Sequence, residues 1–274
     1  MTTTASKSVQ SAVVEGSVLS RDGAPIGFFR VGAGPALVFV HGSISDHRDW
    51  KKVARILSAR YTCILMDRRG RGRSRHHSSA YSIQNEYEDV AAVVDDAGPD
   101  ACLVGHSFGA ACALGGATLS AVRRLVLYEP PYPIGKLVGG ENMVPFKQAL
   151  ATGDLDLALA VGMEKFIGLP AAVVAATRAS RAWAHMRGMV TTWTRELEVM
   201  DALGDNLSAF RQFPTPTLLL RGSESPEYPF QSTTRALQQT LPHVRVSTLQ
   251  GQSHMAMRLA PEVVAERISQ FVGE

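Results

Sequence analysis

Cysteine is scarce in this chain of 274 residues, which contains only Cys63, Cys102 and Cys112. An odd number of cysteines cannot form a fully paired disulfide framework, and no cysteine and histidine spacing typical of a zinc site is present. Cys63 and Cys102 lie in apolar runs that predict buried strands, and Cys112 lies in a predicted helix. Buried, reduced thiols indicate a reducing compartment, so we expect a cytoplasmic protein that binds no metal ion.

Long apolar segments and strong charge are also absent. The longest apolar runs have the length of a strand, which argues against a membrane-spanning helix. The first sixteen residues, MTTTASKSVQSAVVEG, lack the apolar core of a signal peptide. The net charge is only +3, and no basic stripe is interleaved with aromatic residues. We therefore expect neither a membrane nor a nucleic acid as a partner.

The chain does contain an alternation of strand-like and helical segments. Hydrophobic residues make up 45% and charged residues 19%, which is the balance of a globular protein. Because strands alternate with helices, we predict an α/β fold with a mostly parallel sheet. The predicted strands are 13–19, 26–31, 35–40, 62–67, an apolar run from residue 101, 122–128, 217–220 and 244–249, and the predicted helices include 50–57, 83–94 with Ser82 as N-cap, 231–241 and 261–272.

One long segment interrupts this alternation. Residues 131–208 contain no clear strand, only helical patches rich in alanine, leucine and methionine. Predicted strands nevertheless precede and follow this segment. We therefore interpret 131–208 as a helical cap inserted into one α/β core, which residues 1–130 and 209–274 form.

The chain is organised around the pentapeptide Gly105-His106-Ser107-Phe108-Gly109. A short apolar run precedes it and a run of small helix-forming residues follows, so the serine is predicted to lie in a sharp turn between a strand and a helix. Such a turn pushes the hydroxyl out of the fold, and the flanking glycines let strand and helix approach closely. The N–H of Phe108 would then lie at a helix N-terminus, where an oxyanion is stabilised.

Four motifs occur in one order along the chain: His41-Gly42, the stretch 67–74 (DRRGRGRS), the pentapeptide 105–109, and Gly251-Gln252-Ser253-His254. With these motifs at family-like spacing, the chain resembles the α/β-hydrolase superfamily over nearly its whole length. The resemblance implies a central sheet flanked by helices, an inserted helical cap, and no metal or organic cofactor. It also implies that the arginine-rich stretch is a structural turn and not a site for phosphate or nucleic acid.

The resemblance places the nucleophile and its oxyanion donors. Ser107 would be the nucleophile, and a serine needs a base within hydrogen-bond reach because its hydroxyl is unreactive at its ordinary pKa. One oxyanion donor would be the N–H of Phe108. The second would come from the turn after His41-Gly42, as the N–H of Ser43.

The base would be His254, one of eight histidines. It lies in the loop after the last predicted strand, where the family has its catalytic histidine. His41 and His106 belong to the backbone motifs, so we expect them to pack or to form hydrogen bonds.

The acid of the triad is the position where the sequence departs from the family pattern. The family usually has an aspartate in the loop after the seventh strand, and Ser225 stands at that place within Gly222-Ser223-Glu224-Ser225-Pro226. A serine cannot stabilise an imidazolium as a carboxylate does. Two carboxylates remain as alternatives, Glu224 in the same loop and Glu129 at the end of the sixth strand. We favour Glu129, because a carboxylate at an apolar strand end is costly without a partner such as His254.

Aromatic and methionine side chains in the cap suggest the nature of the substrate. Trp183 and Met186 are three residues apart and Met189 and Trp193 four apart, so each pair could share a helix face. These residues would either attach the cap to the core or form an apolar roof over Ser107. We expect Trp183, Met186 and Trp193 to bind substrate, which would then be apolar or aromatic.

The function expected from these residues is hydrolysis of a carboxylic ester or lactone through an acyl-enzyme and a Ser-His-Glu triad. One alternative is hydrolysis of a carbon–carbon bond in a diketone-type substrate, and another is a hydrolase-fold ligand receptor with little turnover. Epoxide hydrolysis and dehalogenation are disfavoured, because those relatives need a carboxylate nucleophile at the position of Ser107. The expected partner is a small apolar ester or lactone, and a homodimer is one candidate oligomeric state.

Overall fold

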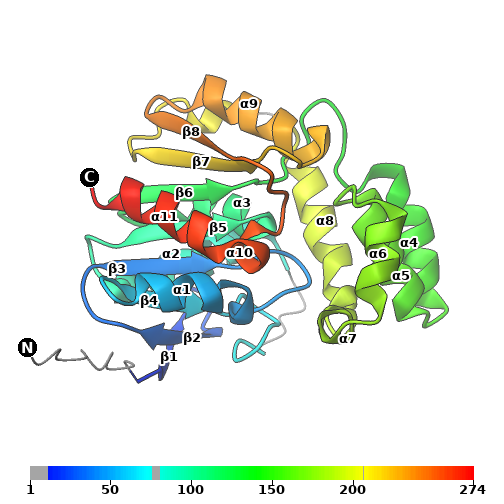
Figure 1. Ribbon diagram of the computed structural model, residues 1–274, viewed down its shortest axis with the longest axis horizontal. Coiled ribbons are helices and arrows are strands. Elements are labelled where there is room, and N and C mark those ends of the chain that lie inside the picture. The colour runs from blue at the N-terminus through cyan, green and yellow to red at the C-terminus, as the bar shows by residue number, and fades with distance from the viewer. Residues whose placement is uncertain (1–11, 76–80, 206) are drawn as a thin grey trace, which may run out of the picture.

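The fold is built on one sheet of eight strands in the order β1-β2-β4-β3-β5-β6-β7-β8. The computed structural model describes residues 12–75, 81–205 and 207–274 (Figure 1). The strands are β1 (Val14–Leu19), β2 (Pro25–Val31), β3 (Ala36–Val40), β4 (Thr62–Met66), β5 (Cys102–His106), β6 (Arg124–Tyr128), β7 (Thr217–Gly222) and β8 (Val244–Leu249). Each corresponds to a strand expected from the sequence.

The strand directions make the sheet mostly parallel. β2 pairs antiparallel with β1 and with β4, whereas every neighbouring pair from β4 through β3, β5, β6 and β7 to β8 is parallel. All residues of β5 are buried, as expected for a central strand covered on both faces. The predicted α/β fold with a mostly parallel sheet is therefore confirmed.

Helices cover both faces of the sheet (Figure 1). Successive strand residues point to opposite faces. On one face Leu37 and Phe39 pack with apolar residues of α1 (Lys51–Leu57) and α11 (Pro261–Val272). On the other face Val38 and Val40 pack with residues of α2 (Ile83–Ala97), α3 (Phe108–Gly116) and α9 (Ser232–Thr240).

The start of α2 follows from its first residues. Ser82 accepts a hydrogen bond from the N–H of Asn85, and the Asn85 side chain accepts one from the N–H of Ser82. This reciprocal pair satisfies backbone donors that the first turn of a helix leaves free. The predicted N-cap is therefore confirmed, and Asn85 completes it.

The described residues between β6 and β7 form helices and loops and no strand. They include α4 (Met143–Ala151), α5 (Leu155–Lys165), α6 (Ala171–Arg178), α7 (Arg181–Arg187) and α8 (Trp193–Ala202). Figure 1 shows these inserted helices together beyond one end of the strands, at the right of the view, with α8 nearest to the sheet. The division into a core and a cap remains a prediction.

The remaining helical elements are short. They are η1 (His47–Trp50), η2 (Gly140–Asn142), η3 (Val190–Thr192), η4 (Ser208–Phe210), η5 (Glu227–Gln231) and α10 (Ala256–Leu259).

All three cysteines are free and buried. They lie in β4, β5 and α3, where the sequence predicts them. Burial raises the pKa of the Cys63 thiol to about 12. Among the described residues, no helix is both long and apolar enough to cross a membrane.

Candidate active site

Ser107 occupies a strained turn between β5 and α3. Its backbone has φ 54° and ψ −130°, a region that non-glycine residues rarely adopt. A Cβ at Gly105 would lie 2.5 Å from the Cα of Ala110, and a Cβ at Gly109 would clash with the carbonyl oxygen of His41. Both glycines are therefore needed for the close approach of strand and helix, as the sequence predicted.

Backbone strain is concentrated around this turn. Within the described chain the non-glycine residues with positive φ are Ile44 at 45°, Ser107 at 54° and Glu129 at 50°. They follow the carboxyl ends of β3, β5 and β6, and the ends of neighbouring parallel strands meet at one edge of the sheet. Each such residue destabilises the folded state by about 1–3 kcal/mol, and residues in strained conformations cluster at functional sites.

Glu129 and His254 form a hydrogen bond that is shielded from solvent. The carboxylate oxygen Oε2 of Glu129 lies 2.7 Å from Nδ1 of His254, and the side chains are 0% and 2% exposed. The other oxygen, Oε1, accepts a hydrogen bond of 2.6 Å from the N–H of Gly222. Glu224 is exposed, and its carboxylate accepts from the hydroxyl of Ser223. Of the two alternative acids, Glu129 is thus the one that contacts His254, and its catalytic role remains a prediction.

Several neighbours fix the position of His254. The ring of Phe230 stacks on it with centroids 3.9 Å apart, and Nε2 of His106 donates to the carbonyl oxygen of His254 over 2.8 Å. The hydroxyl of Tyr128 donates to the carbonyl oxygen of Ser253. Because a carboxylate only accepts, Nδ1 of His254 carries the proton and Nε2 is left as the acceptor, as a base requires.

The two other motif histidines support the backbone. His41 donates from Nδ1 to the carbonyl oxygen of Gly42 over 2.8 Å, and its Nε2 accepts from the N–H of Arg68 over 3.1 Å. Burial, assisted by the charge of Arg68, lowers the pKa of His41 to about 4. Burial also lowers the pKa of His106 well below its ordinary value. Both rings are therefore neutral at neutral pH and form the hydrogen bonds that the sequence suggested.

A cavity of about 330 Å³ joins the candidate catalytic residues. Ser107 and His254 line it together with Ser43 and Phe108, the residues expected to supply the oxyanion donors. Phe108 is the first residue of α3, so its N–H has no partner within that helix. Much of the remaining lining is apolar and comes from the inserted helices, including Met163, Met186, Trp193, Leu197 and Met200.

Two of the three expected substrate-binding residues line this cavity, and Trp183 does not. The indole N–H of Trp183 donates to Oδ1 of Asp156 over 2.6 Å, which directs the ring toward α5. The guanidinium carbon of Arg178 lies 5.7 Å from the centre of the same ring. Trp183 is therefore a contact between inserted helices that does not line this cavity. Substrate binding by Trp183, Met186 and Trp193 stays a prediction.

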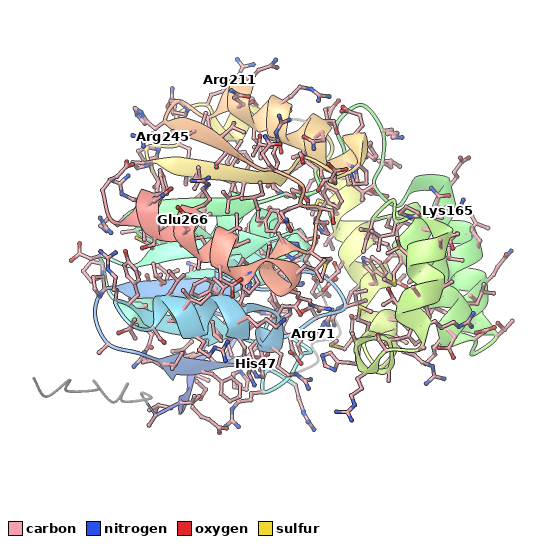
Figure 2. The ribbon with its side chains drawn as sticks, viewed as in Figure 1. His47, Arg71, Lys165, Arg211, Arg245 and Glu266 are labelled. Carbon is pink, nitrogen blue, oxygen red and sulfur yellow. The ribbon has the colours of Figure 1, made fainter. Side chains whose placement is uncertain are left out.

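The arginine-rich stretch is buried in ion pairs. Arg68 contacts Glu86 at 2.8 Å and Glu196 at 2.6 Å, Arg69 contacts Asp89 at 2.6 Å, and Arg71 contacts Glu196 at 2.7 Å. Figure 2 shows Arg71 between the sheet and the inserted helices. These arginines are paired with carboxylates of the chain, in keeping with a structural turn.

A second group of acidic side chains and a histidine lies near η1. Ligand atoms of Asp46, His47 and Asp67 lie within 4.8 Å of one another. However, Asp67 already accepts hydrogen bonds from Nδ1 of His47 at 2.8 Å and from the N–H of Arg73 at 3.0 Å, and Asp46 pairs with Arg48. The carboxylates are thus engaged by donors of the chain, and we assign this group a structural role.

The fold and the strained turn that carries Ser107 between β5 and α3, called the elbow below, agree with the family relationship. A model of the alpha/beta hydrolase family matches residues 37–267, and the chain belongs to this family. A crystal structure of an alpha/beta hydrolase from Sphaerobacter thermophilus is similar with a TM-score of 0.82 and 31% identity, covering 93% of this chain and 99% of that one. The family is one of enzymes, and the eight-stranded sheet described above is its fold.

Two relatives that are named for an activity are less similar in sequence. The chain is 24% identical over 260 residues to a 2-(acetamidomethylene)succinate hydrolase of Mesorhizobium japonicum, which covers 88% of this chain and 89% of the relative. It is 25% identical over 271 residues to a non-heme haloperoxidase of Rhodococcus erythropolis, with coverage of 93% and 98%. The two relatives are named for different activities, so the substrate of this chain must be inferred from its site.

The contact between Glu129 and His254 leads to a prediction about the acid. Glu129→Gln should lower kcat by up to about four orders of magnitude, because an amide at this position allows the wrong tautomer of His254. Glu224→Gln, a matched change in an exposed side chain, should have little effect. Both are measured on the same ester by steady-state kinetics. A crippled Glu224→Gln variant beside an active Glu129→Gln variant would refute the assignment.

The buried neutral ring of His41 predicts a dependence of stability on pH. The folded pKa of about 4 lies below the ordinary histidine pKa of about 6.5, so the unfolded chain binds a proton first as the pH falls. The contribution of the neutral His41 ring to the free energy of unfolding is fully present above about pH 6.5. As the pH falls to about 4, the free energy of unfolding decreases by about 3 kcal/mol.

This loss is measured by urea unfolding of the wild type and of His41→Asn between pH 7 and pH 4. The difference in unfolding free energy between the two proteins should shrink as the pH falls. His243→Asn, which changes an exposed histidine, serves as the control and should follow the wild type. A constant difference between wild type and His41→Asn over this range would contradict the prediction.

Proposed function

We propose that this protein hydrolyses a carboxylic ester or lactone of a small apolar molecule through an acyl-enzyme. The observation that carries the proposal is the combination of Ser107 at the elbow with a histidine oriented by a buried carboxylate, both facing one apolar cavity. This is the arrangement that activates a serine for acyl transfer.

The chemistry proceeds in two halves. In the first, the hydroxyl of Ser107 attacks the acyl carbon while its proton passes to Nε2 of His254, and the oxyanion accepts hydrogen bonds from the N–H groups of Ser43 and Phe108. His254 then gives the proton to the leaving alcohol. In the second half, His254 takes a proton from water, which attacks the acyl-enzyme, and the proton returns to Ser107 as the acid leaves.

Glu129 orients His254 throughout these steps. Its two oxygens accept from Nδ1 of His254 and from the N–H of Gly222, so both are occupied when the imidazolium forms. The negative charge stabilises the imidazolium without taking its proton. The proposed steps use only these side chains, backbone amides and water.

The cavity supports a small apolar substrate. Its volume of about 330 Å³ is at the lower end of the range for ligand pockets. Methionine side chains among the lining residues adapt to irregular shapes, and Trp193 adds a flat apolar wall. We propose that the inserted helices act as the cap that encloses this substrate.

Loss of the nucleophile or the base should abolish turnover. Ser107→Ala and His254→Ala should each lower kcat by about three to six orders of magnitude, and the double variant should be scarcely worse, because the residues act as a unit. Turnover of a p-nitrophenyl ester measures this, with circular dichroism to verify folding. Additive losses, or a Ser107→Ala variant of nearly wild-type activity, would sink the mechanism.

The same assay separates the alternative functions. Repeated turnover of the ester supports the hydrolase. A single burst of product without further turnover would indicate a ligand receptor. Loss of a diketone chromophore with esters left intact would indicate carbon–carbon bond hydrolysis.

The lining of the cavity predicts its preference for acyl length. Met186→Ala removes part of the apolar wall and so enlarges the cavity. The value of kcat/KM for an ester with a longer acyl chain should therefore rise relative to that for the acetate ester by about tenfold. Trp183→Phe is the matched control on the same helix, because it removes a contact outside the cavity. Its ratio of longer ester to acetate should equal that of the wild type. If both variants shift the ratio equally, Met186 does not contact the substrate.

A further inference from the structure

The peptide group between Gly42 and Ser43 is held from one side. Its carbonyl oxygen accepts from Nδ1 of His41 over 2.8 Å and from Nη1 of Arg68 over 3.2 Å. A trans peptide is planar, so its N–H points away from its carbonyl oxygen. Fixing the carbonyl of Gly42 therefore fixes the direction of the Ser43 N–H, which is one of the two proposed oxyanion donors.

Arg68 also contacts the element that carries the other donor. Its guanidinium carbon lies 4.4 Å from the centre of the Phe108 ring, within the range of a cation–π contact. Its own backbone N–H donates to Nε2 of His41 over 3.1 Å, which orients the ring that holds Gly42. One fully buried arginine thus touches both walls of the proposed oxyanion hole.

Two carboxylates hold this arginine, and they come from different parts of the chain. Glu86 of α2 accepts from Nε at 3.0 Å and from Nη2 at 2.8 Å, which ties Arg68 to the helices on the sheet. Glu196 of α8 accepts from Nη2 at 2.6 Å and is itself 1% exposed. The guanidinium is a rigid planar fork, so a displaced carboxylate changes the direction of all its donors.

Glu196 lies at the boundary between the inserted helices and the cavity. It lines the cavity, and its Oε1 also accepts from Nη2 of Arg71 over 2.7 Å. Burial alone would raise the pKa of Glu196, but the charges of Arg68 and Arg71 outweigh it and the hydroxyl of Ser43 adds to their effect, so the pKa is lowered. Glu196 is therefore ionised at neutral pH and adjoins the oxyanion turn itself.

We propose that Arg68 is the positioning residue of the oxyanion hole, and that Glu196 makes this positioning depend on the docking of α8 against the sheet. The proposal rests on the serine hydrolase function proposed above. The turn it concerns is strained, with Ile44 at φ 45°, so surrounding contacts must hold it in place. The inserted helices then complete the catalytic geometry as well as enclosing the substrate.

The test compares substitutions that each remove one charge but contact different partners. Glu196→Gln weakens the link to Arg68, whereas Glu198→Gln, two residues along the same helix, disturbs only an exposed pair with Lys147. Arg71→Met disturbs the same buried ion cluster without touching Gly42 or Phe108. Kinetics on one ester are combined with the affinity for a boronic acid that forms an adduct with Ser107.

Glu196→Gln should lower kcat by about tenfold to a hundredfold, because a small misplacement of catalytic donors has effects of this size. KM should stay within about twofold, and affinity for the boronic acid should fall in parallel with kcat. Glu198→Gln should match the wild type, and Arg71→Met should lower the melting temperature more than kcat. Equal kcat for Glu196→Gln and wild type, or equal losses for Glu196→Gln and Arg71→Met, would overturn the proposal.

A measurement without turnover separates this proposal from the proposed function. Hydrogen–deuterium exchange in residues 41–45 of the resting protein should be faster in Glu196→Gln than in Glu198→Gln. If the wild type hydrolyses no ester, the proposed function fails and the exchange result still decides whether Glu196 orders the turn. If Glu196→Gln does not fold, Arg68→Lys keeps the charge and should show the same faster exchange. Unchanged exchange in the folded variant would overturn the proposal.

Discussion

Glu129 has a carboxylate that is entirely removed from solvent, and its hydrogen bond to His254 compensates for that burial. A buried charge is costly unless it is paired and hydrogen-bonded, and removing one partner of such a pair destabilises a protein by about 3–5 kcal/mol. Nδ1 of His254 and the N–H of Gly222 satisfy the two oxygens. The same contact that permits the burial also fixes the tautomer of the histidine, so stability and chemistry depend on one interaction.

The sheet supplies the framework on which this contact is built. Glu129 follows β6, Ser107 follows β5, and the turn with Ser43 follows β3, and these three strands are neighbours in the order β3-β5-β6. Parallel pairing brings their carboxyl ends to one edge. The loop after β8 adds His254 and the inserted helices close the edge with apolar side chains, so residues far apart in sequence share one cavity.

The sequence predicted the elements and the motif residues because their signals are local. Short strand-like runs predicted the eight strands, and the glycines on either side of Ser107 predicted the close approach of strand and helix. Glu129 could be favoured over Glu224 because a carboxylate in an apolar strand end needs a partner. The roles of Phe230 and Tyr128 were not predicted, since no local pattern indicates which distant ring or hydroxyl packs on His254.

The inserted helices were the part of the fold that the sequence predicted least well. A spacing of three residues predicts that Trp183 and Met186 share a helix face, but it does not indicate which neighbour that face meets. Asp156 on α5 attracts the indole N–H of Trp183, and Met186 reaches the cavity instead. The sequence did not predict the role of Glu196 either, because a glutamate in a helix is ordinarily solvated. Its partners, Arg68 and Arg71, lie in the arginine-rich stretch about 125 residues earlier, so no local pattern links them.

We propose that Ser107, His254 and the two backbone donors form one acyl-transfer site, and a crystal structure of a phosphonate adduct is the sharpest test. We expect phosphorus bound to Oγ of Ser107, with the phosphonyl oxygen accepting from the N–H groups of Ser43 and Phe108. The hydrogen bond between Glu129 and His254 should persist in the adduct. An adduct on another residue, or a phosphonyl oxygen directed away from both N–H groups, would contradict an acyl-transfer site at Ser107.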